Sequence, residues 1–359
     1  MMRKNNNKIN SLSGPNESLG SFNNSVVVAF SGGVDSSVSA LILKNKGFNV
    51  RAVFMKLDNS TEKEKTAKKV AKEIGVPFEV IDLRKEFKET IIDYFIKEYK
   101  LGNTPNPCVL CNKEIKFGLL LKKFNNDFLA TGHYAKTKDG RLYKAKDCKK
   151  DQSYFLWKLN SKTLKKVIFP LSKMTKEDVK EIARKNKLPV SKKESQEICF
   201  IKETNNEFLK KYIKEKEGDI INKKGSTIGK HKGVWFYTIG QRRGIGLSGG
   251  PYWVIDKDVK RNKLIVSSNE KDLFSKDVSF KNANWIRKVD FPLRVKAKIR
   301  YGHKGDFGVL NNNKLVFDRP QKAITSGQSI VFYNKSEVIG GGIIKWKNIY
   351  ILIMRQQRQ

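Results

Sequence analysis

The sequence predicts an α/β protein in which a doubly wound parallel sheet is followed by a small glycine-rich central domain and a C-terminal β-barrel. Two observations carry this prediction. In the first half of the chain, apolar runs typical of buried strands alternate with helical stretches, a rhythm that produces parallel strands with helices on both faces. From about residue 217, short apolar runs alternate with glycines, and such runs are typical of small β-domains.

The first domain is expected to span residues 25–216. Each strand is predicted from an apolar run such as Val26-Val27-Val28, and each helix from apolar residues at helical spacing. Residues 103–107 contain two prolines and are expected to lie outside any helix. The expected strands are 26–30, 50–54, 78–82 and 127–131, and the expected helices are 35–46, 62–74, 85–99, 113–124, 175–186 and 205–216.

Two smaller domains are expected after the first. Glycines separate short apolar runs in residues 217–276, which are therefore predicted to form a central domain of short strands. Alternating runs such as 293–299 and 329–332 predict a small β-barrel over residues 277–346. Residues 1–24 are rich in Asn and Ser and are expected to form a disordered arm, and residues 347–359 are expected to form a tail.

The chain carries a large excess of positive charge, with 73 Lys and Arg against 36 Asp and Glu in 359 residues and a formal net charge of +37. A field of this size favours a nucleic-acid partner, because Lys and Arg neutralise phosphates and release their counterions. Lys and Asn are abundant along the whole chain. A general compositional bias is therefore the alternative explanation of the charge.

No apolar run approaches the ~18 residues of a membrane span, and the N-terminal residues lack the apolar core of a secretory signal. We therefore expect a cytoplasmic protein with no membrane partner. Its four cysteines, Cys108, Cys111, Cys148 and Cys199, are too few for a disulfide scaffold and point to catalysis or metal binding. By itself Cys199 is typical of a core cysteine, whereas Cys148 lies between charged residues and is expected to be exposed.

The most informative motif is Ser-Gly-Gly-Val-Asp-Ser at residues 31–36, which follows an apolar strand and leads into a helix. Such a loop presents backbone N–H groups and hydroxyls to one point and makes an anion cradle. Glycine lets the backbone approach a phosphate closely. Asp35 would repel phosphate unless a cation lay between them, so it suggests a bound Mg²⁺. The alternative is a turn that binds nothing.

Two thiols, Cys108 and Cys111, follow the proline-rich segment and are expected at the start of a helix. There the positive end of the helix dipole would lower their pKa, and Lys113 and Lys116 on the same turn would act in the same direction. The spacing thus favours reactive sulfur chemistry. The alternatives are half of a structural metal site and an inert buried pair.

Eight blocks of the sequence together resemble one protein family. The loop at residues 31–36 resembles the SGGxDS signature of the PP-loop ATP pyrophosphatases, enzymes that split ATP into AMP and pyrophosphate. With the other blocks, in order, the chain from about residue 25 to 346 resembles the bacterial tRNA-specific 2-thiouridylases. The blocks are residues 31–37, 54–56, 104–117, 130–135, 150–156, 198–201, 237–244 and 340–344.

The resemblance implies that sulfur replaces the C2 oxygen of the wobble uridine in tRNAs for Lys, Glu and Gln. ATP would adenylate that oxygen, and AMP would then leave. Cys199 would carry the sulfur as a persulfide, and Cys111 would attack it, forming a Cys111–Cys199 disulfide and releasing sulfide at the activated carbon. The residues implied in ATP binding are Ala29, Phe30, Ser31, Gly32, Gly33, Val34, Asp35, Ser36, Met55 and Gly132.

The resemblance also implies a tRNA partner and a sulfur donor, which would be a cysteine desulfurase acting directly or through a carrier protein. The target base would be flipped out of the anticodon loop before its C2 is reached. The residues implied around this base are Asn106, Pro107 and Cys108, and those implied in further contacts to tRNA are His133, Lys150, Asp151, Gln152, Arg300, Tyr301 and Gln328.

The sequence departs from the family pattern at two places. Many members carry Asp at the position of Cys108, where it could act as a general acid or base, and the segment after Met55 is shorter than in the family. Cys108, Cys111 and Cys199 could instead hold three corners of an iron–sulfur cluster. Two other hypotheses share the loop at residues 31–36: a different ATP pyrophosphatase acting on a small metabolite, and an RNA-binding protein with a vestigial nucleotide loop.

Overall fold

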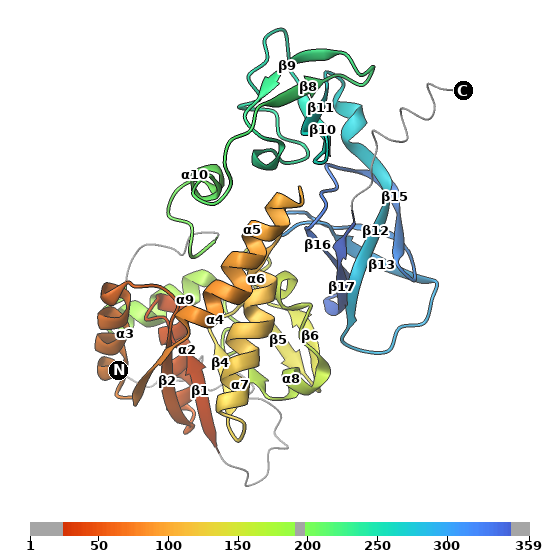
Figure 1. Ribbon diagram of the computed structural model, residues 1–359. Coiled ribbons are helices and arrows are strands. Elements are labelled where there is room, and N and C mark those ends of the chain that lie inside the picture. The colour runs from red at the N-terminus through yellow and green to blue at the C-terminus, as the bar shows by residue number, and fades with distance from the viewer. Residues whose placement is uncertain (1–23, 191–197, 346–359) are drawn as a thin grey trace.

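The computed structural model describes residues 24–190 and 198–345. Figure 1 shows a sheet flanked by helices at the bottom of the view, a cluster of short strands at the top and a barrel on the right. Within the described ranges, no helix is long and apolar enough to cross a membrane. The arm expected at residues 1–24 and the tail expected at residues 347–359 lie outside the described residues, apart from Asn24.

The first part is a five-stranded sheet with strand order β3-β2-β1-β4-β7, in which all neighbouring strands run parallel. Val26, Val28 and Phe30 are almost fully buried, because both faces of a parallel sheet are covered. The predicted doubly wound parallel sheet is thus confirmed. Its strands are β1 (Ser25–Ala29), β2 (Asn49–Lys56), β3 (Phe78–Asp82), β4 (Phe128–Thr131) and β7 (Val167–Ile168).

Helices cover both faces of this sheet. On one face, Leu43 and Val70 lie in one apolar core with Val26 and Val28. The alternate residues of the same strands, such as Val27, share a second core with the helices of the opposite face. The helices of the first face are α2 (Val34–Asn45), α3 (Thr61–Ile74) and α9 (Lys176–Lys185).

The opposite face carries two helical stretches with π-helical segments, which are rare and frequently mark functional sites. The second stretch begins at Pro107 and not at residue 113 as expected, because proline lacks the N–H that the first turn of a helix leaves unused. The two stretches are α4 (Arg84–Phe87), η1 (Lys88–Ile92) and α5 (Asp93–Lys100), and then α6 (Pro107–Leu110), η2 (Cys111–Leu119) and α7 (Leu120–Lys123).

The helix expected at residues 205–216 is shorter in the structure and ends at Lys210. The helix does not extend over residues 214–217, which are all charged and offer no apolar side chain to the core. The remaining elements of the first part are β5 (Ala135–Lys138), β6 (Arg141–Lys144), η3 (Ser153–Leu156), α8 (Ser161–Lys165) and α10 (Asn205–Lys210).

The central domain is a four-stranded sheet with order β10-β11-β8-β9. Its apolar face shares a core with α5 of the first part, where Phe95 and Tyr99 lie with Ile220, Val254 and Leu264. The central domain is therefore seated on the end of α5, as Figure 1 also shows. Its elements are β8 (Gly218–Ile221), β9 (Thr227–His231), η4 (Val234–Phe236), β10 (Trp253–Asp258), β11 (Lys263–Ser267) and η5 (Glu270–Leu273).

The predicted C-terminal barrel is confirmed. Its strands run in the order β12-β15-β14-β13-β16-β17, and pairing of β12 with β17 closes it. The sequence did not predict that the hairpin β5–β6 of the first part joins this sheet, with Leu142 beside Val338. The barrel strands are β12 (Phe274–Trp285), β13 (Leu293–Lys298), β14 (Asp306–Asn311), β15 (Lys314–Lys322), β16 (Ser329–Asn334) and β17 (Glu337–Ile344).

Candidate functional site

The loop between β1 and α2 closes on itself through its serine hydroxyls. The backbone N–H of Ser31 donates to Ser36 Oγ at 3.2 Å, and Ser36 Oγ donates to the carbonyl of Gly33 at 3.1 Å. Gly32 has a φ of +74°, and a Cβ there would lie 2.7 Å from the Cα of Ala67 in α3. Only glycine fits this conformation and this contact. The loop is therefore held in one shape at the N-terminus of α2, where backbone N–H groups favour anions.

Residues predicted to bind ATP gather at the carboxyl ends of three neighbouring strands. Ala29 ends β1, Met55 lies near the end of β2, and Gly132 directly follows β4. A Cβ at Gly132 would lie 2.8 Å from the backbone N of Ser36. The residue that follows β4 therefore packs directly against the first turn of α2, at the end of the loop. Ligands of open α/β sheets bind at this edge. The arrangement is suited to a nucleotide, and the roles of the individual residues stay predictions.

Asp35 of the loop is paired with a lysine that the sequence did not point to. Lys176 Nζ lies 2.6 and 2.8 Å from the two carboxylate oxygens of Asp35, and the Tyr134 hydroxyl donates to the same carboxylate at 2.8 Å. The lysine is buried, with 8% of its surface exposed. The cation beside Asp35 is thus an ammonium group of the protein, and a carboxylate engaged in this way does not fit a magnesium ion as it stands.

Signals for these two partners of Asp35 were weak. Tyr134 lies in the block 130–135, but nothing in that block links a phenol to the loop. Lys176 is separated from Asp35 by 141 positions and begins α9 directly after its N-cap Thr175. Burial and proximity to Asp35 raise the pKa of Tyr134 well above its ordinary value. The phenol therefore stays protonated and able to donate its hydrogen bond.

Of the three cysteines implicated in catalysis, Cys108 and Cys199 each lie within electrostatic range of Cys111. Cys111 is buried in η2, Cys108 is partly exposed in α6, and Cys199 is exposed in the turn at residues 198–200. Burial raises the pKa of Cys111 to about 12, and negative charge on Cys199 or Cys108 would raise it further. Partial loss of hydration raises the pKa of Cys199 as well, although its side chain is still exposed. Cys148 is exposed, as expected.

The expectation of a lowered thiol pKa at Cys111 is wrong. Because the helix begins at Pro107, Cys111 lies beyond its first turn, where the dipole acts most strongly. The loss of hydration on burial then outweighs the attraction of nearby cations. Cys199 also differs from the expectation of a core cysteine, since its turn lies on the surface.

Lys116 is the cation that these groups share. Its charge opposes the rise in the pKa of both Cys111 and Cys199, and burial together with Lys116 lowers the pKa of His133. Its place follows from η2, since residues five positions apart are hydrogen-bonded neighbours in a π-helix. Lys113, which was expected to act alongside it, is half exposed and pairs with Glu114 at 2.9 Å. The Lys116 ammonium therefore stabilises the thiolate form of both cysteines.

The described residues contain no group of three or more His, Cys, Asp or Glu side chains arranged to hold a metal ion. Cys108, Cys111 and Cys199 do not form such a set in this structure, although they lie near one another. The residues present therefore do not fit an iron–sulfur cluster as they stand.

Several residues predicted to contact tRNA are bonded within the protein. His133 is buried and lies 2.7 Å from Thr131 Oγ1 through its Nδ1. The buried Asp151 accepts a hydrogen bond from Ser153 Oγ at 2.9 Å, and Gln152 Oε1 accepts one from the backbone N–H of Tyr134 at 3.0 Å. Lys150 beside them is partly exposed. Their contact with tRNA stays a prediction.

Tyr301, a barrel residue predicted to contact tRNA, lies near the thiol helix, which is the helical stretch 107–123 that carries Cys108 and Cys111. The ring of Tyr301 lies 4.5 Å from that of Phe155, whose carbonyl accepts a hydrogen bond from Asn112 Nδ2 at 3.2 Å. Arg300 is exposed and Nη1 donates to the carbonyl of Lys322. Aromatic and cationic side chains of this kind stack on bases and pair with phosphates.

Gln328 and Asn106 are less exposed to solvent than Arg300 and Tyr301. Gln328 Nε2 donates to the carbonyl of Thr104 at 2.8 Å, and Asn106 hydrogen-bonds to the buried Tyr154. Pro107 is buried at the start of α6. The segment that precedes the thiols is thus enclosed by residues from several parts of the fold.

Comparisons with known proteins match the chain over nearly its whole length. Residues 24–203 match a family model described as the tRNA methyl transferase HUP domain, residues 206–268 the tRNA methyl transferase PRC-barrel domain, and residues 275–344 the aminomethyltransferase beta-barrel domain. The chain is also similar to curated proteins. The tRNA-specific 2-thiouridylase MnmA of Syntrophomonas wolfei is 44% identical over 337 residues, which cover 89% of this chain and 99% of that protein.

Two further relatives give the same result. The tRNA-specific 2-thiouridylase MnmA 2 of Clostridium botulinum strain Langeland is 44% identical over 346 residues, covering 89% of this chain and 98% of that protein. The tRNA-specific 2-thiouridylase MnmA of Clostridioides difficile is 44% identical over 356 residues, which cover 90% of this chain and 98% of that protein.

Proposed function

This chain belongs to the tRNA-specific 2-thiouridylase family, and on that premise we propose that it is an ATP-dependent sulfurtransferase that 2-thiolates the wobble uridine of tRNAs for Lys, Glu and Gln. One observation carries the proposal. Cys111 and Cys199, far apart in the sequence, lie in electrostatic range of each other, in a fold whose parallel sheet ends in an anion-binding loop. A phosphate cradle and a thiol pair are what activation of a carbonyl oxygen and its replacement by sulfur require.

The first step is adenylation of the uridine. Membership of the PP-loop ATP pyrophosphatases implies ATP, which we place against residues 31–36 with its adenosine between Met55 and Gly132. The C2 oxygen attacks the α-phosphorus, a P–O bond to pyrophosphate breaks, and AMP becomes bonded to the base. The N–H groups at the start of α2 and the ammonium of Lys176 favour the charge that collects on pyrophosphate.

The second step is sulfur transfer. Cys199 carries a persulfide, and Cys111, whose thiol gives up its proton to water as it reacts, attacks the Cys199 Sγ. A Cys111–Cys199 disulfide forms, the S–S bond of the persulfide breaks, and hydrosulfide leaves with the electron pair. Hydrosulfide then adds to C2, and AMP departs with the former O2 oxygen. Each turnover oxidises two thiols, so an external thiol must reduce the disulfide before the next one.

Partner recognition is proposed from exposure and charge. Cys199 lies in an exposed turn, which is accessible to a cysteine desulfurase or a carrier protein that delivers sulfur in the cytoplasm. Arg300 and Tyr301 of the barrel are proposed to hold tRNA, together with Gln328 and the segment at residues 150–152, while His133 and Asn106-Pro107-Cys108 lie toward the flipped base. The net charge of +37 supports binding of a polyanion.

The family-model descriptions mention methyl transfer, whereas the curated relatives are thiouridylases. The shared electrostatic environment of Cys111 and Cys199 around Lys116 supports sulfur transfer instead.

The test is reconstitution of the reaction. The purified protein is incubated with an unmodified tRNA transcript, ATP, magnesium, cysteine, a cysteine desulfurase and a thiol reductant, and nucleosides are analysed by mass spectrometry. We expect 2-thiouridine together with equimolar AMP. Formation of neither product, with a transcript that binds the protein, would refute the proposal.

Matched cysteine variants assign the roles. Cys199→Ser is expected to abolish thiolation while tRNA and ATP still bind, and Cys111→Ser is expected to stop the reaction with sulfur held on Cys199. Cys148→Ser, which alters an exposed thiol elsewhere, is expected to react at the wild-type rate. Normal thiolation by Cys199→Ser would contradict the persulfide role.

A further inference from the structure

The segment that leads into the thiol helix is bonded to a turn of the barrel. This turn, residues 325–328 between β15 and β16, is called the barrel turn below. The backbone N–H of Thr104 donates to the carbonyl of Ser326 at 2.9 Å, and Ser326 Oγ donates to Asn103 Oδ1 at 2.7 Å. Gln328 Nε2 donates to the carbonyl of Thr104 at 2.8 Å. Both backbone polar groups of Thr104 are therefore satisfied by the barrel.

Gly327 allows the backbone of the barrel turn to lie directly against Asn103 and Thr104. Its φ is +87°, and a Cβ there would lie 2.8 Å from the Cβ of Asn103 and 3.0 Å from the backbone N of Thr104. Side chains of L-residues rarely adopt this φ, and no real Cβ approaches other atoms so closely. The barrel turn thus packs backbone against backbone, and the three hydrogen bonds depend on this close approach.

Residues 103–104 also contact two other parts of the fold, the helix α5 and the central domain. Asn103 Nδ2 donates to Glu98 Oε2 in α5 at 2.7 Å. In the central domain, the hydroxyl of Thr238 lies 3.4 Å from that of Thr104. Thr238 belongs to the block 237–244, which the sequence singled out and which the proposed reaction does not use. Residues 103–104 are therefore the point at which all three parts of the molecule meet.

The link from this point to the thiols is short and stiff. Pro105 and Pro107 flank Asn106, and each proline ring fixes one backbone angle. Pro107 is the first residue of the helix that carries Cys108 and Cys111. The barrel also reaches the link indirectly, through Tyr154 of η3. The buried Tyr154 hydroxyl donates to the carbonyl of Ser329 in the barrel at 2.8 Å, and Tyr154 also hydrogen-bonds to Asn106. A shift of the barrel turn must move the start of the thiol helix.

We propose that Gln328 and Gly327 are positioning residues through which the barrel sets the position of the thiol helix, so that a change at the tRNA-holding face of the barrel is transmitted to Cys108 and Cys111. The role of tRNA in this scheme rests on the proposed function. The mechanical link itself does not, because the hydrogen bonds exist in the protein alone. Gln328 acts on the reaction through the main chain of Thr104, whatever further contact it makes to RNA.

The test measures thiol reactivity without tRNA or ATP. Gln328→Met keeps the size of the side chain and removes the donated hydrogen bond, and Gly327→Ala separates the two backbones. Each variant is treated with iodoacetamide, and the alkylation rates of Cys108 and Cys111 are read from their peptide by mass spectrometry. We expect about fivefold faster alkylation of the buried Cys111, the increase in local opening that follows the loss of one hydrogen bond.

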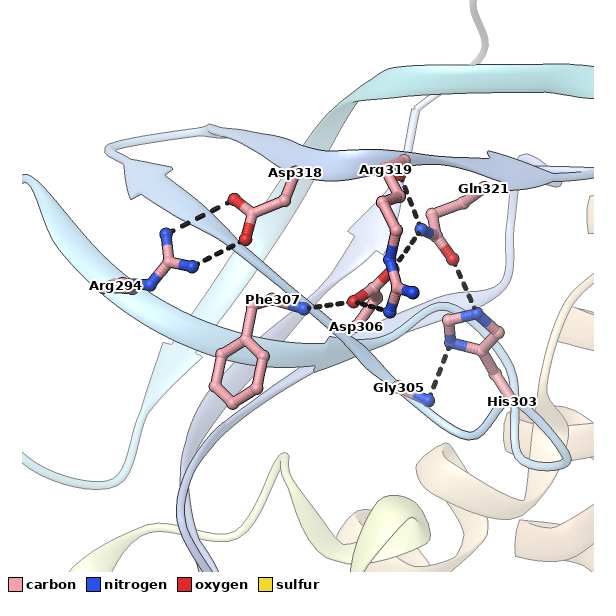
Figure 2. Close-up of polar contacts among 8 residues, drawn as sticks. All are labelled: Arg294, His303, Gly305, Asp306, Phe307, Asp318, Arg319 and Gln321. Carbon is pink, nitrogen blue, oxygen red and sulfur yellow. Dashed lines mark hydrogen bonds and ion pairs between the residues drawn. The ribbon is translucent and has the colours of Figure 1, made fainter.

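The matched control is Gln321→Met. Gln321 lies in the same barrel and is bonded to Asp306, Arg319 and His303, as Figure 2 shows, but to no part of the segment before the thiols. The control and the exposed Cys148 should alkylate at wild-type rates. If the control accelerates Cys111 as much as Gln328→Met does, the effect is a general loosening of the barrel and the proposal is overturned.

Two further outcomes are decisive. Wild-type alkylation in Gln328→Met, with weakened tRNA binding, would make Gln328 a direct tRNA ligand only and would overturn the proposal. Faster alkylation with an unchanged melting temperature supports it, because a merely structural loss would lower that temperature. Since the alkylation assay contains no nucleotide or RNA, its result stands whether or not the chain thiolates uridine. Gln328→Met decides the matter if Gly327→Ala does not fold.

Discussion

The alkylation rate of Cys111 should keep rising with pH far above neutrality. Burial raises the pKa of this thiol to about 12, against about 8.5 for an ordinary cysteine. Burial disfavours the charged form, so the thiolate appears only as the pH approaches the raised pKa. At about pH 8 the thiolate fraction of Cys111 is therefore on the order of a thousandfold smaller than that of an ordinary cysteine.

Lys116 provides the perturbation. Its ammonium lowers the pKa of Cys111, so Lys116→Met should raise that pKa further and slow alkylation on the order of tenfold at a given pH. Lys113→Met is the matched control, because Lys113 is half exposed and pairs with Glu114 at 2.9 Å. It should leave the rate unchanged.

The assay is alkylation by iodoacetamide between about pH 7 and pH 10, with a short cysteine peptide as the reference thiol. The logarithm of the Cys111 rate should rise with unit slope across the whole range, while the reference levels off above about pH 9. A plateau for Cys111 below that pH would refute the reasoning, since it would mean that the thiolate forms in spite of burial. Equal rates in Lys116→Met and the control would refute the part assigned to the ammonium.

Three other predictions concern the loop and the surface. Gly32→Ala should destabilise the first domain and abolish ATP binding, because the added Cβ would lie 2.7 Å from the Cα of Ala67. Calorimetry measures both the thermal stability and the affinity for ATP, and a normal ATP affinity would contradict this prediction. Lys176→Met should weaken ATP binding on the order of tenfold, since the Lys176 ammonium lies 2.6 Å from Asp35 beside the loop. Lys185→Met on the same helix is the control, and equal ATP affinities of the two variants would count against a role of Lys176 in ATP binding. Affinity for tRNA should fall by about 10³-fold or more between about 50 and 200 mM salt, and a salt-independent affinity in filter binding would show that charge is not the driving force.

Local features of the fold could be predicted from the sequence. The apolar run before residue 31, its glycines and the helix after it are neighbours in the chain, so their pattern predicts the strand, the loop and α2 directly. The barrel was predicted for the same reason, since alternation within each short strand is a local signal. The start of α6 was missed because proline both breaks helices and begins them, and the π-helical segment was missed because its apolar spacing resembles that of an ordinary helix.

What the sequence could not supply is contact between distant residues and the burial that follows from it. The pairing of Lys176 with Asp35 joins two segments that share no local pattern. The sign of the pKa shift at Cys111 depends on how deeply its helix is buried, and the sequence predicted the opposite sign from the helix dipole alone. The contact of Gln328 with Thr104 was likewise invisible, although Gln328 itself was singled out.

The hairpin β5–β6 has a consequence for anyone who divides this protein into fragments. Through the pairing of Leu142 with Val338, and a hydrogen bond of 2.8 Å from the backbone N–H of Lys144 to the carbonyl of Ser336, the hairpin is an integral edge of the barrel sheet. A recombinant piece ending before β12 would leave the backbone edge of β6 unpaired and Leu142 uncovered, which favours self-association. Expression of the catalytic half by itself therefore calls for a redesigned, charged edge on that hairpin.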